Sequence, residues 1–566
     1  MADSFDALLT QLGTGKWNIF FALASSFRFL LSPSQSLSSV YLAPSVNYTC
    51  QPHTVDHVIE VKHDSCSYVI NSTSTGRLED VACIKWTFDK SVFSSTLTSE
   101  FELVCEREYL RPTYQSVYML GTCVGPLVCG YFADRFGRKI VYVVSQIVVS
   151  AASLGLCLLH NFSTILFLRF IIGCSELLIH LVLALEVCEP RHRATMGILT
   201  GMPWALGTML WGGAAYAIRD WRWLQLAASL PSVLMFPALY YLDESPRWLI
   251  VQGHASRAQK VLEKAARWNK TSLPSEYELK TIMSQIKRQA NTEEEEAGTE
   301  RKSQGDTGDS VSCGNLTAPR LLSTRKIITI TVAVCFLFLS AALVFDGLNL
   351  GGDLYSENIF LYLIFAGLME FPGCTLSVPI VNRYGRKRSL AVCFVCCSIM
   401  LFTLTFIPTG HWQLMMTLAL LGKMFISAAF QIIYVYSNEV FPTEVRVQGV
   451  ETGSAVGQVA AIIVPFISIY LGPVIPWLPS VVFGTMSILA SVSLTTMKET
   501  KGANLPDTIA QLELSGKKEE RYIRVYTNQP GDGTGEEVFE ESKWCKIKLK
   551  GRDFTLCWTY LKIPKL

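Results

Sequence analysis

The stretch GYFADRFGRK, residues 130–139, decides the fold, and a shorter copy, NRYGRK, occupies residues 382–387. Each copy follows a long apolar segment and carries a glycine beside a cluster of basic side chains. Two more pairs of stretches match in the same order: EVCEPRHRA at 186–194 with EVFPTEVR at 439–446, and DESPRWL at 243–249 with KETKG at 498–502. Three matches in one register indicate that the chain contains two copies of one unit.

The chain as a whole is apolar and poor in charge. Of its 566 residues, 50% are hydrophobic and only 17% are charged, and the mean hydropathy is +0.31. This composition is too apolar for a soluble protein of this size. The net charge of +2 gives no bulk basic character. We therefore expect a lipid bilayer as the environment and no nucleic acid as a partner.

Segments long enough to cross a bilayer recur along the chain. A membrane-spanning helix needs roughly 20 apolar residues. About twelve such segments occur, at residues 17–43, 112–133, 140–159, 164–187, 194–217, 223–242, 326–346, 358–381, 389–408, 413–436, 449–471 and 474–497. The sequence therefore predicts an all-α membrane protein with two six-helix halves, 17–242 and 326–497.

Basic residues in the short connections predict the orientation. They gather after the second, fourth and eighth spans and are absent after the third, ninth and eleventh, although IRDWRW after the fifth is contrary. The termini, 1–16 and 498–566, are then cytosolic, and residues 44–111 lie outside. The connection 243–325 is also cytosolic; it begins as a helical pattern and becomes too polar to form a core, so its second part is expected to be disordered.

The outer segment has features of the extracellular compartment. It contains two sequons and an even number of cysteines, which favours glycosylation and two disulfides, with free thiols as the alternative. Three pairings of the four cysteines are possible. The residues concerned are Asn47 and Asn71 for the glycans and Cys50, Cys66, Cys83 and Cys105 for the disulfides.

Two parallel six-helix repeats are the architecture of the major facilitator superfamily, in which the halves rock about a central site. The helix ends on the cytosolic side must then latch and release. Charged side chains and a glycine in the repeated stretches suit ion pairs between the halves, although any single arginine could merely obey the positive-inside rule. The predicted gating residues are Asp134, Arg135, Gly137, Arg138, Glu186, Arg193, Arg383, Arg386, Glu439 and Arg446.

Longer stretches resemble the organic cation, organic anion and carnitine transporter family. They include STLTSEFELVC at 95–105, ESPRWLIVQGHASRAQKVLEKAARWN at 244–269, EFPGC at 370–374 and GKMFISAAFQIIYVYSNEVFPTEVR at 422–446. The resemblance runs from about residue 40 to 510. It implies transport of small organic ions across the plasma membrane by alternating access, without ATP hydrolysis.

The same resemblance implies a central cavity. Glu370 matches a cavity carboxylate of the cation-carrying members, and an ionisable group within the bilayer is a functional candidate by default. Aromatic rings beside it would add cation–π attraction of roughly 0.5–2 kcal/mol each, although packing is the alternative for any one ring. The resemblance places these rings at Trp204, Phe338, Phe345, Phe430 and Tyr434.

Departures from the relatives bear on the charge of the substrate. Gln458 stands where anion and carnitine carriers have arginine and cation carriers have aspartate, and Cys374 replaces a basic residue of many anion carriers. Asp346 adds a second carboxylate. The sequence therefore favours a cation or a zwitterion such as carnitine. Lys423 could instead receive an anionic group, so transport of organic anions is the alternative.

Two polar residues, Glu176 and His180, lie one turn apart in the fourth span. They could carry a proton, because histidine titrates near neutral pH, or they could make a polar contact between helices.

Other functional classes lack support in the sequence. The eight histidines form no set with metal-ligand spacing, so we expect neither an enzyme nor a metal or cofactor site. A receptor that resembles transporters but does not transport is the remaining alternative. We expect a monomer.

Overall fold

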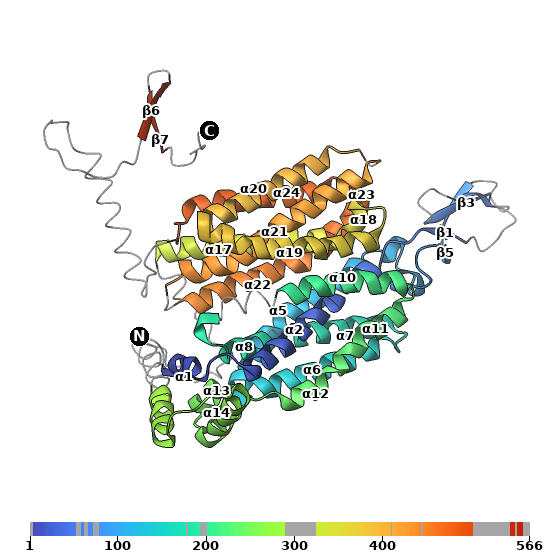
Figure 1. Cartoon of the computed structure of the whole chain (residues 1–566). Helices are drawn as coiled ribbons and strands as arrows, with labels where there is room; N and C mark the ends of the chain where they lie inside the picture. Colours follow the sequence, from blue (N-terminus) through green and yellow to red (C-terminus); the bar gives the residue numbers. More distant parts are fainter. Residues whose placement is uncertain are drawn as a thin grey trace, which may run out of the picture. The chain divides into compact units, whose positions relative to one another are not determined.

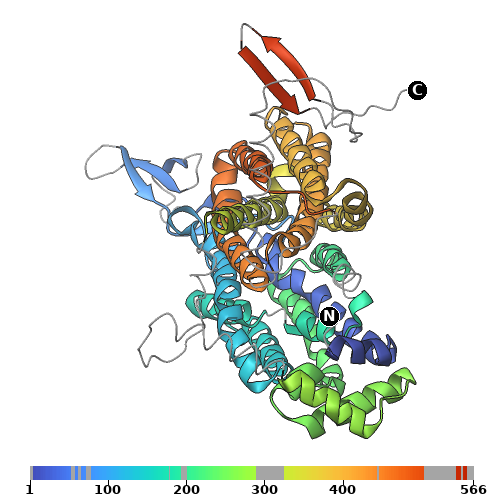
Figure 2. The same cartoon turned by 90° about the vertical axis from the view of Figure 1, so that its left-hand side faces the viewer.

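The computed structural model describes residues 4–51, 58–61, 66–71, 78–176, 179–192, 201–288, 324–408, 410–442, 445–501, 544–549 and 552–557. The chain divides into one unit over 1–509 and a second over 510–566. Long helices lie side by side in the larger unit (Figures 1 and 2).

The helices of the N-terminal half follow the predicted spans. The fourth and sixth spans are each divided into two helices, and Pro231 lies just before the division of the sixth. The helices are α2 (Lys16–Ser36), α5 (Leu110–Phe136), α6 (Arg138–Leu156), α7 (Phe162–Ser175) with α8 (Ile179–Glu186), α10 (Met202–Ala217), and α11 (Trp221–Val233) with α12 (Met235–Tyr241).

The helices of the C-terminal half also follow the prediction. They are α17 (Arg325–Leu350), α19 (Ile359–Tyr384), α20 (Arg386–Thr405), α21 (Trp412–Val440), α22 (Arg446–Pro465) and α24 (Leu478–Ser493). Shorter elements complete the half: α18 (Gly352–Tyr355), the π-helix η3 (Phe466–Leu471), α23 (Gly472–Val474) and η4 (Leu494–Thr496). Within it, α17 packs on α22 and α21, and α19 packs on α21.

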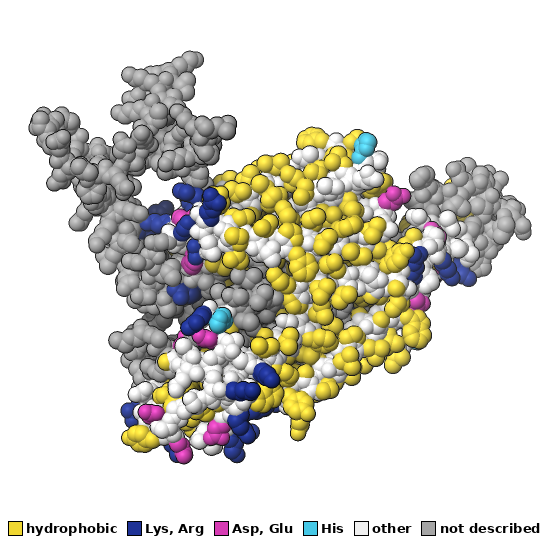
Figure 3. Space-filling model, in the orientation of Figure 1, with side chains coloured by type: hydrophobic (Ala, Val, Ile, Leu, Met, Phe, Trp, Pro, Cys, Tyr) yellow, Lys and Arg dark blue, Asp and Glu magenta, His cyan; other side chains and the backbone are white. Residues whose placement is uncertain are grey.

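Apolar side chains cover the middle of the bundle on one face. Figure 3 shows hydrophobic side chains over the middle of one face, with charged side chains gathered at the two ends. Among the described residues, nine helices are long and apolar enough to cross a membrane. Three predicted spans, the first, fourth and fifth, are not among these nine helices, and each has a local reason. The helix α2 is rich in serine and contains Arg28, α7 and α8 are separate, and α10 begins after residues 193–200, which are not described.

The segment before α5 forms strands at one end of the bundle, which we call the loop end. Two antiparallel sheets are present, β1 with β5 and β2–β3–β4. Disulfides join Cys50 to Cys83 and Cys66 to Cys105, which selects one of the three possible pairings. The elements are α3 (Ser39–Leu42), β1 (Tyr48–Cys50), β2 (Val58–Val61), β3 (Ser67–Asn71), β4 (Leu78–Ala82), β5 (Trp86–Phe88), α4 (Leu97–Glu100) and η1 (Cys105–Arg107).

The opposite end carries both copies of the repeated stretch, and we call it the motif end. Short helices cover it: α1 (Ser4–Leu12), η2 (Pro190–His192), α13 (Pro246–Val251), α14 (Ala255–Asn269) and a helix over 276–288. Apolar residues of α14 recur on one face, as in Ala258, Leu262 and Ala265, and are fully buried. With Phe5 and Leu8 of α1 they share one core, so this part of the connection 243–325 is helical.

The smaller unit contains one described element pair. The strands β6 (Trp544–Leu549) and β7 (Arg552–Cys557) form an antiparallel hairpin. Most of the polar stretch predicted to be disordered, 289–323, lies outside the described residues.

Candidate functional site

Four helices of the C-terminal half and one of the N-terminal half carry the predicted site residues. Phe338, Phe345 and Asp346 lie on α17 and Glu370 lies on α19. The other members are Phe430 and Tyr434 on α21, Gln458 on α22 and Trp204 on α10. Because α10 packs on α19, the two halves meet beside Glu370.

A buried ion pair occupies the middle of the C-terminal half. The Lys423 Nζ lies 3.0 Å from Oε1 of Glu370, and the two residues are 0% and 3% exposed. The same Nζ lies 3.0 Å from the centroid of the Phe345 ring and donates to the Phe345 carbonyl oxygen at 3.4 Å. The sequence predicts Glu370 as an anionic group of the cavity, and in the structure its charge is paired with that of Lys423.

Asp346 is a second carboxylate beside this pair. It is partly buried, and it interacts electrostatically with Lys423 and with Glu370. Two carboxylates and one ammonium group give the cluster, which we call the charged cluster, a formal charge of −1. Asp346 is the carboxylate of this cluster that is not in the ion pair with Lys423.

The predicted aromatic residues of α17 and α21 come together. The ring centroids of Phe338 and Tyr434 are 5.0 Å apart, those of Phe345 and Phe430 are 5.5 Å apart, and those of Phe430 and Tyr434 are 5.7 Å apart. Tyr434 Oη also lies 3.4 Å from the Ser454 hydroxyl of α22. Since Phe345 also touches Lys423, the aromatic rings and the charged cluster form one continuous site.

The remaining two predicted residues lie where the halves meet. Gln458 Oε1 accepts a hydrogen bond from Thr122 Oγ1 of α5 at 3.2 Å. The indole N–H of Trp204 is buried and has no hydrogen-bond partner among the described residues. Buried donors are usually satisfied, so this N–H is available to a bound molecule or a water.

The halves are in contact toward the loop end. Phe360, near the start of α19, stacks on Tyr41 of α3 with ring centroids 5.4 Å apart. Further along α19, a Cβ on Gly367 would lie 2.7 Å from the carbonyl oxygen of Ala205, so glycine allows α19 and α10 to approach closely. The site is therefore covered on its loop side in this conformation.

The N-terminal half has its own buried ion pair. Arg28 of α2 forms an ion pair with Glu176, at the end of α7, and the Ser32 hydroxyl donates to the same carboxylate. Arg28 is 3% exposed. Glu176 therefore makes a polar contact between helices, one of the two alternatives from the sequence. The side chain of His180 lies outside the described residues.

The first copy of the repeated stretch forms a braced turn. Gly137 joins α5 to α6 with φ +105°, a conformation that favours glycine. Glu244 accepts from the backbone N–H of Lys139 with its two oxygens at 3.0 and 3.1 Å. A Cβ on Gly137 would lie 2.3 Å from Glu244 Oε2, so the glycine also makes room for the carboxylate.

The second copy repeats this geometry. Gly385 joins α19 to α20 with φ +94°, and a Cβ there would lie 2.6 Å from Glu499 Oε2. Glu499 Oε1 accepts from the backbone N–H of Arg386 at 2.8 Å. Burial alone would raise the pKa of Glu499. Hydrogen bonds from several backbone N–H groups together have the larger effect, so the pKa of Glu499 is lowered. The carboxylate is thus held in its charged form as a brace.

Ion pairs of the predicted gating residues lie within each half. Arg138 Nε is 3.6 Å from Glu186, and Arg138 is 3.1 Å from Asp134. In the other half, Arg386 is 2.8 Å from Glu439. The pairing of such residues between the halves stays a prediction.

The other predicted gating residues lie at the same end of the bundle. Arg135 donates to the Tyr131 hydroxyl at 3.2 Å, Arg383 lies near the end of α19, and Arg446 begins α22. Arg193 lies outside the described residues.

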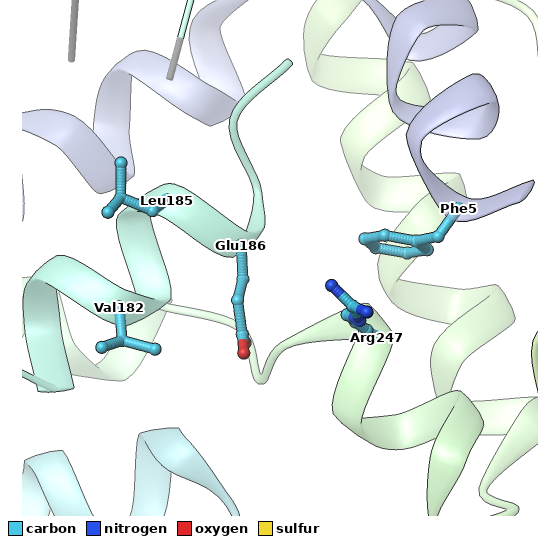
Figure 4. A pocket seen from close by; sticks show the side chains of 5 residues that line it. All are labelled: Phe5, Val182, Leu185, Glu186 and Arg247. Carbon is cyan, nitrogen blue, oxygen red and sulfur yellow. The ribbon is translucent and has the colours of Figure 1, made fainter. Parts of the chain in front are cut away.

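A small cavity of about 230 Å³ lies at the motif end. Figure 4 shows Glu186 of α8 and Arg247 of α13 facing it, with Phe5 of α1 at one side. The cavity adjoins the gating residues and shares no lining residue with the charged cluster.

Comparisons with known proteins agree with this architecture. The model of the sugar (and other) transporter family matches residues 95–509. The organic cation transporter protein of Drosophila melanogaster is 29% identical over 88% of this chain and 89% of its own length. Solute carrier family 22 member 6 of Pseudopleuronectes americanus is 30% identical over 76% of this chain and 74% of its own. The chain belongs to the solute carrier family 22 branch of the sugar (and other) transporter family.

Solved structures confirm the fold. The partially occluded, inward-open xylose transporter XylE of E. coli gives a TM-score of 0.55 at 16% identity, over 86% of this chain and 100% of that one. The protein is thus a multi-pass membrane transporter with the major facilitator fold, as the sequence predicts.

Three residues of the site and of the braced turns were not predicted in these roles. Lys423 was expected only as an alternative countercharge and not as the partner of Glu370. Glu244 and Glu499 were not predicted, although both occur in the matched stretches DESPRWL and KETKG. The signal was their recurrence at equivalent positions after the last span of each half.

Proposed function

We propose that this solute carrier family 22 member carries small organic ions across the plasma membrane by alternating access, with a preference for cations or for zwitterions such as carnitine. The observation that carries the preference is the formal charge of −1 on Asp346, Glu370 and Lys423 beside four aromatic rings. Rings and an excess negative charge are the features that recognise a quaternary ammonium group.

The names of the relatives support the class of substrate. They include an organic cation transporter protein and solute carrier family 22 members. A zwitterion would fit with its cationic group toward Asp346 and the rings and its carboxylate toward the unpaired indole N–H of Trp204. Such an arrangement pairs the cationic group with Asp346 and gives the carboxylate a hydrogen-bond donor.

The position of the site supports alternating access. Gln458 and Trp204 lie where the halves meet, and the halves touch toward the loop end. Opening this contact while closing the motif end would expose the site to the other side of the membrane. We place the loop end outside the cell and both termini in the cytosol, because basic residues gather in the connections of the motif end.

Replacement of Glu370 tests the proposed site. Glu370→Gln removes one negative charge, leaves Lys423 paired only with Asp346, and brings the cluster to neutrality. We expect uptake of a radiolabelled quaternary ammonium ion to fall more than tenfold at low substrate concentration, which corresponds to about 1.4 kcal/mol.

Two further variants control this measurement. Glu370→Asp keeps the charge and should recover part of the uptake. Glu357→Gln removes an exposed carboxylate between α18 and α19 and should leave uptake unchanged. Surface expression is measured for each variant.

Normal cation uptake by Glu370→Gln would refute the proposed site. Uptake of an organic anion that does not change in this variant would favour the anion alternative, with Lys423 as the countercharge.

A further inference from the structure

The charges in the middle of the C-terminal half do not balance. Apart from the charged cluster, the charged side chains on the long helices of this half lie within about two helical turns of the motif end. Examples are Arg325, Glu439, Arg446 and Glu451. The two carboxylates and one ammonium group of the charged cluster leave one negative charge without a partner inside the bundle.

Groups on the surrounding helices do not supply the missing cation. The titratable groups that interact electrostatically with Lys423 are Asp346 of α17, Glu370 and Cys374 of α19, and Cys397 of α20. The helices α22 and α18 also pack on α21. The charged groups of α22 are Arg446 and Glu451, which lie within about two turns of the motif end, and Asp353 of α18 interacts electrostatically with Arg111. None of the groups that interact with Lys423 is a cation, so the second carboxylate of the cluster stays unbalanced.

The two carboxylates of the cluster differ in how they are held. Glu370 is fixed by Lys423 at 3.0 Å and is 3% exposed. Asp346 is partly buried, and within the part of the chain that the structure describes no hydrogen bond or ion pair holds it. Asp346 is therefore the carboxylate that can take up a cation from outside the cluster.

We propose that the protein exchanges its organic cation for a proton, and that Asp346 binds the cation in the loaded carrier and holds the proton in the empty one. This inference rests on the proposed function. A partly buried carboxylate that no hydrogen bond or ion pair holds is unfavourable inside the bundle, so the empty carrier would change conformation only with difficulty while Asp346 is charged. Protonation removes that obstacle, because Glu370 and Lys423 then form a neutral pair.

The charges balance in each half of the cycle. When the cation arrives, the O–H bond of protonated Asp346 breaks, the proton leaves to the aqueous phase on the loading side, and the carboxylate pairs with the cation. On the other side the cation leaves and a proton binds to the same oxygen. One positive charge moves in each direction, so the exchange is electroneutral.

Proteoliposomes containing the full-length protein test this inference. Potassium at equal concentration on both sides with valinomycin holds the membrane potential at zero. The probe is radiolabelled tetraethylammonium, and an internal pH dye reports protons. With an acidic interior, we expect the initial rate of cation uptake to rise several-fold, with alkalinisation of the interior. With an acidic exterior, uptake should fall.

The variants assign the effect to one residue. Asp346→Asn should abolish the response to the pH gradient, Asp346→Glu should restore it in part, and Glu357→Gln should respond as the natural protein does. Uptake by the natural protein that ignores the pH gradient but follows an imposed membrane potential would overturn the exchange. A full response in Asp346→Asn would overturn the role of Asp346. Absence of any uptake of tetraethylammonium and of carnitine, even in exchange with the same unlabelled compound inside, would instead refute the proposed function.

Discussion

At the scale of single residues, Gly137 shows how the repeated stretch determines a turn. Its φ of +105° is one that other residues adopt at a cost of about 1–3 kcal/mol. The space beside it is also filled, because the Glu244 carboxylate lies 2.3 Å from where a Cβ would be. A glycine is therefore required both for the backbone conformation and for the brace.

Substitution of this glycine should destabilise the protein. For Gly137→Ala we expect the midpoint of thermal unfolding in detergent to fall by a few degrees, because the turn is strained and Glu244 must move. Gly130→Ala is the matched control, since a Cβ at that position of α5 would meet nothing within 4 Å. Alanine also favours a helix, so the control should lose no stability. Equal losses in the two variants would contradict the bracing role.

The pairing of Lys423 with Glu370 marks the limit of what could be predicted at this scale. Both residues are visible in the sequence as ionisable groups within apolar spans. However, they lie on α19 and α21, and their contact depends on how each helix is rotated about its axis and on its depth in the bundle. Neither quantity follows from apolar length or from loop charges. The sequence therefore predicts Glu370 and Asp346 as two carboxylates of the site but not the ion pair of Glu370 with Lys423.

At the scale of elements, the order and length of the helices could be predicted well, because a span must reach across the hydrocarbon. The predicted span 112–133 lies wholly within α5, and the predicted span 389–408 overlaps α20 except for its last three residues. Local breaks could not be predicted, as between α7 and α8. The disulfide pairing also needed the structure, since it depends on how β1 and β5 are brought together.

The placement of these elements across the membrane is testable. We expect an epitope inserted at residues 72–77, between β3 and β4, to bind antibody on intact cells. An epitope at residues 291–312 should bind only after permeabilisation, because the described parts of the connection 243–325, residues 243–288 and 324–325, lie at the motif end. Binding to the second epitope on intact cells would contradict the proposed orientation.

At the scale of the whole transporter, the repeat explains the two braced turns but not the charged cluster. Each half ends its second helix in a glycine turn that is braced by a carboxylate from beyond its sixth span, Glu244 or Glu499. The charged cluster lies in the C-terminal half, and the N-terminal half contributes Trp204. Under the proposed function, the halves would move relative to one another while the charges proposed to bind the substrate stay on one of them.

Uptake by cells that express the natural protein tests the central claim most directly. Radiolabelled tetraethylammonium, carnitine and an aromatic carboxylate are compared with untransfected cells over a range of concentrations. We predict saturable accumulation of the quaternary ammonium ion or of carnitine, and none of the carboxylate, because the charged cluster has an excess of one negative charge. Accumulation of the carboxylate alone, or binding of a cation without accumulation, would contradict it.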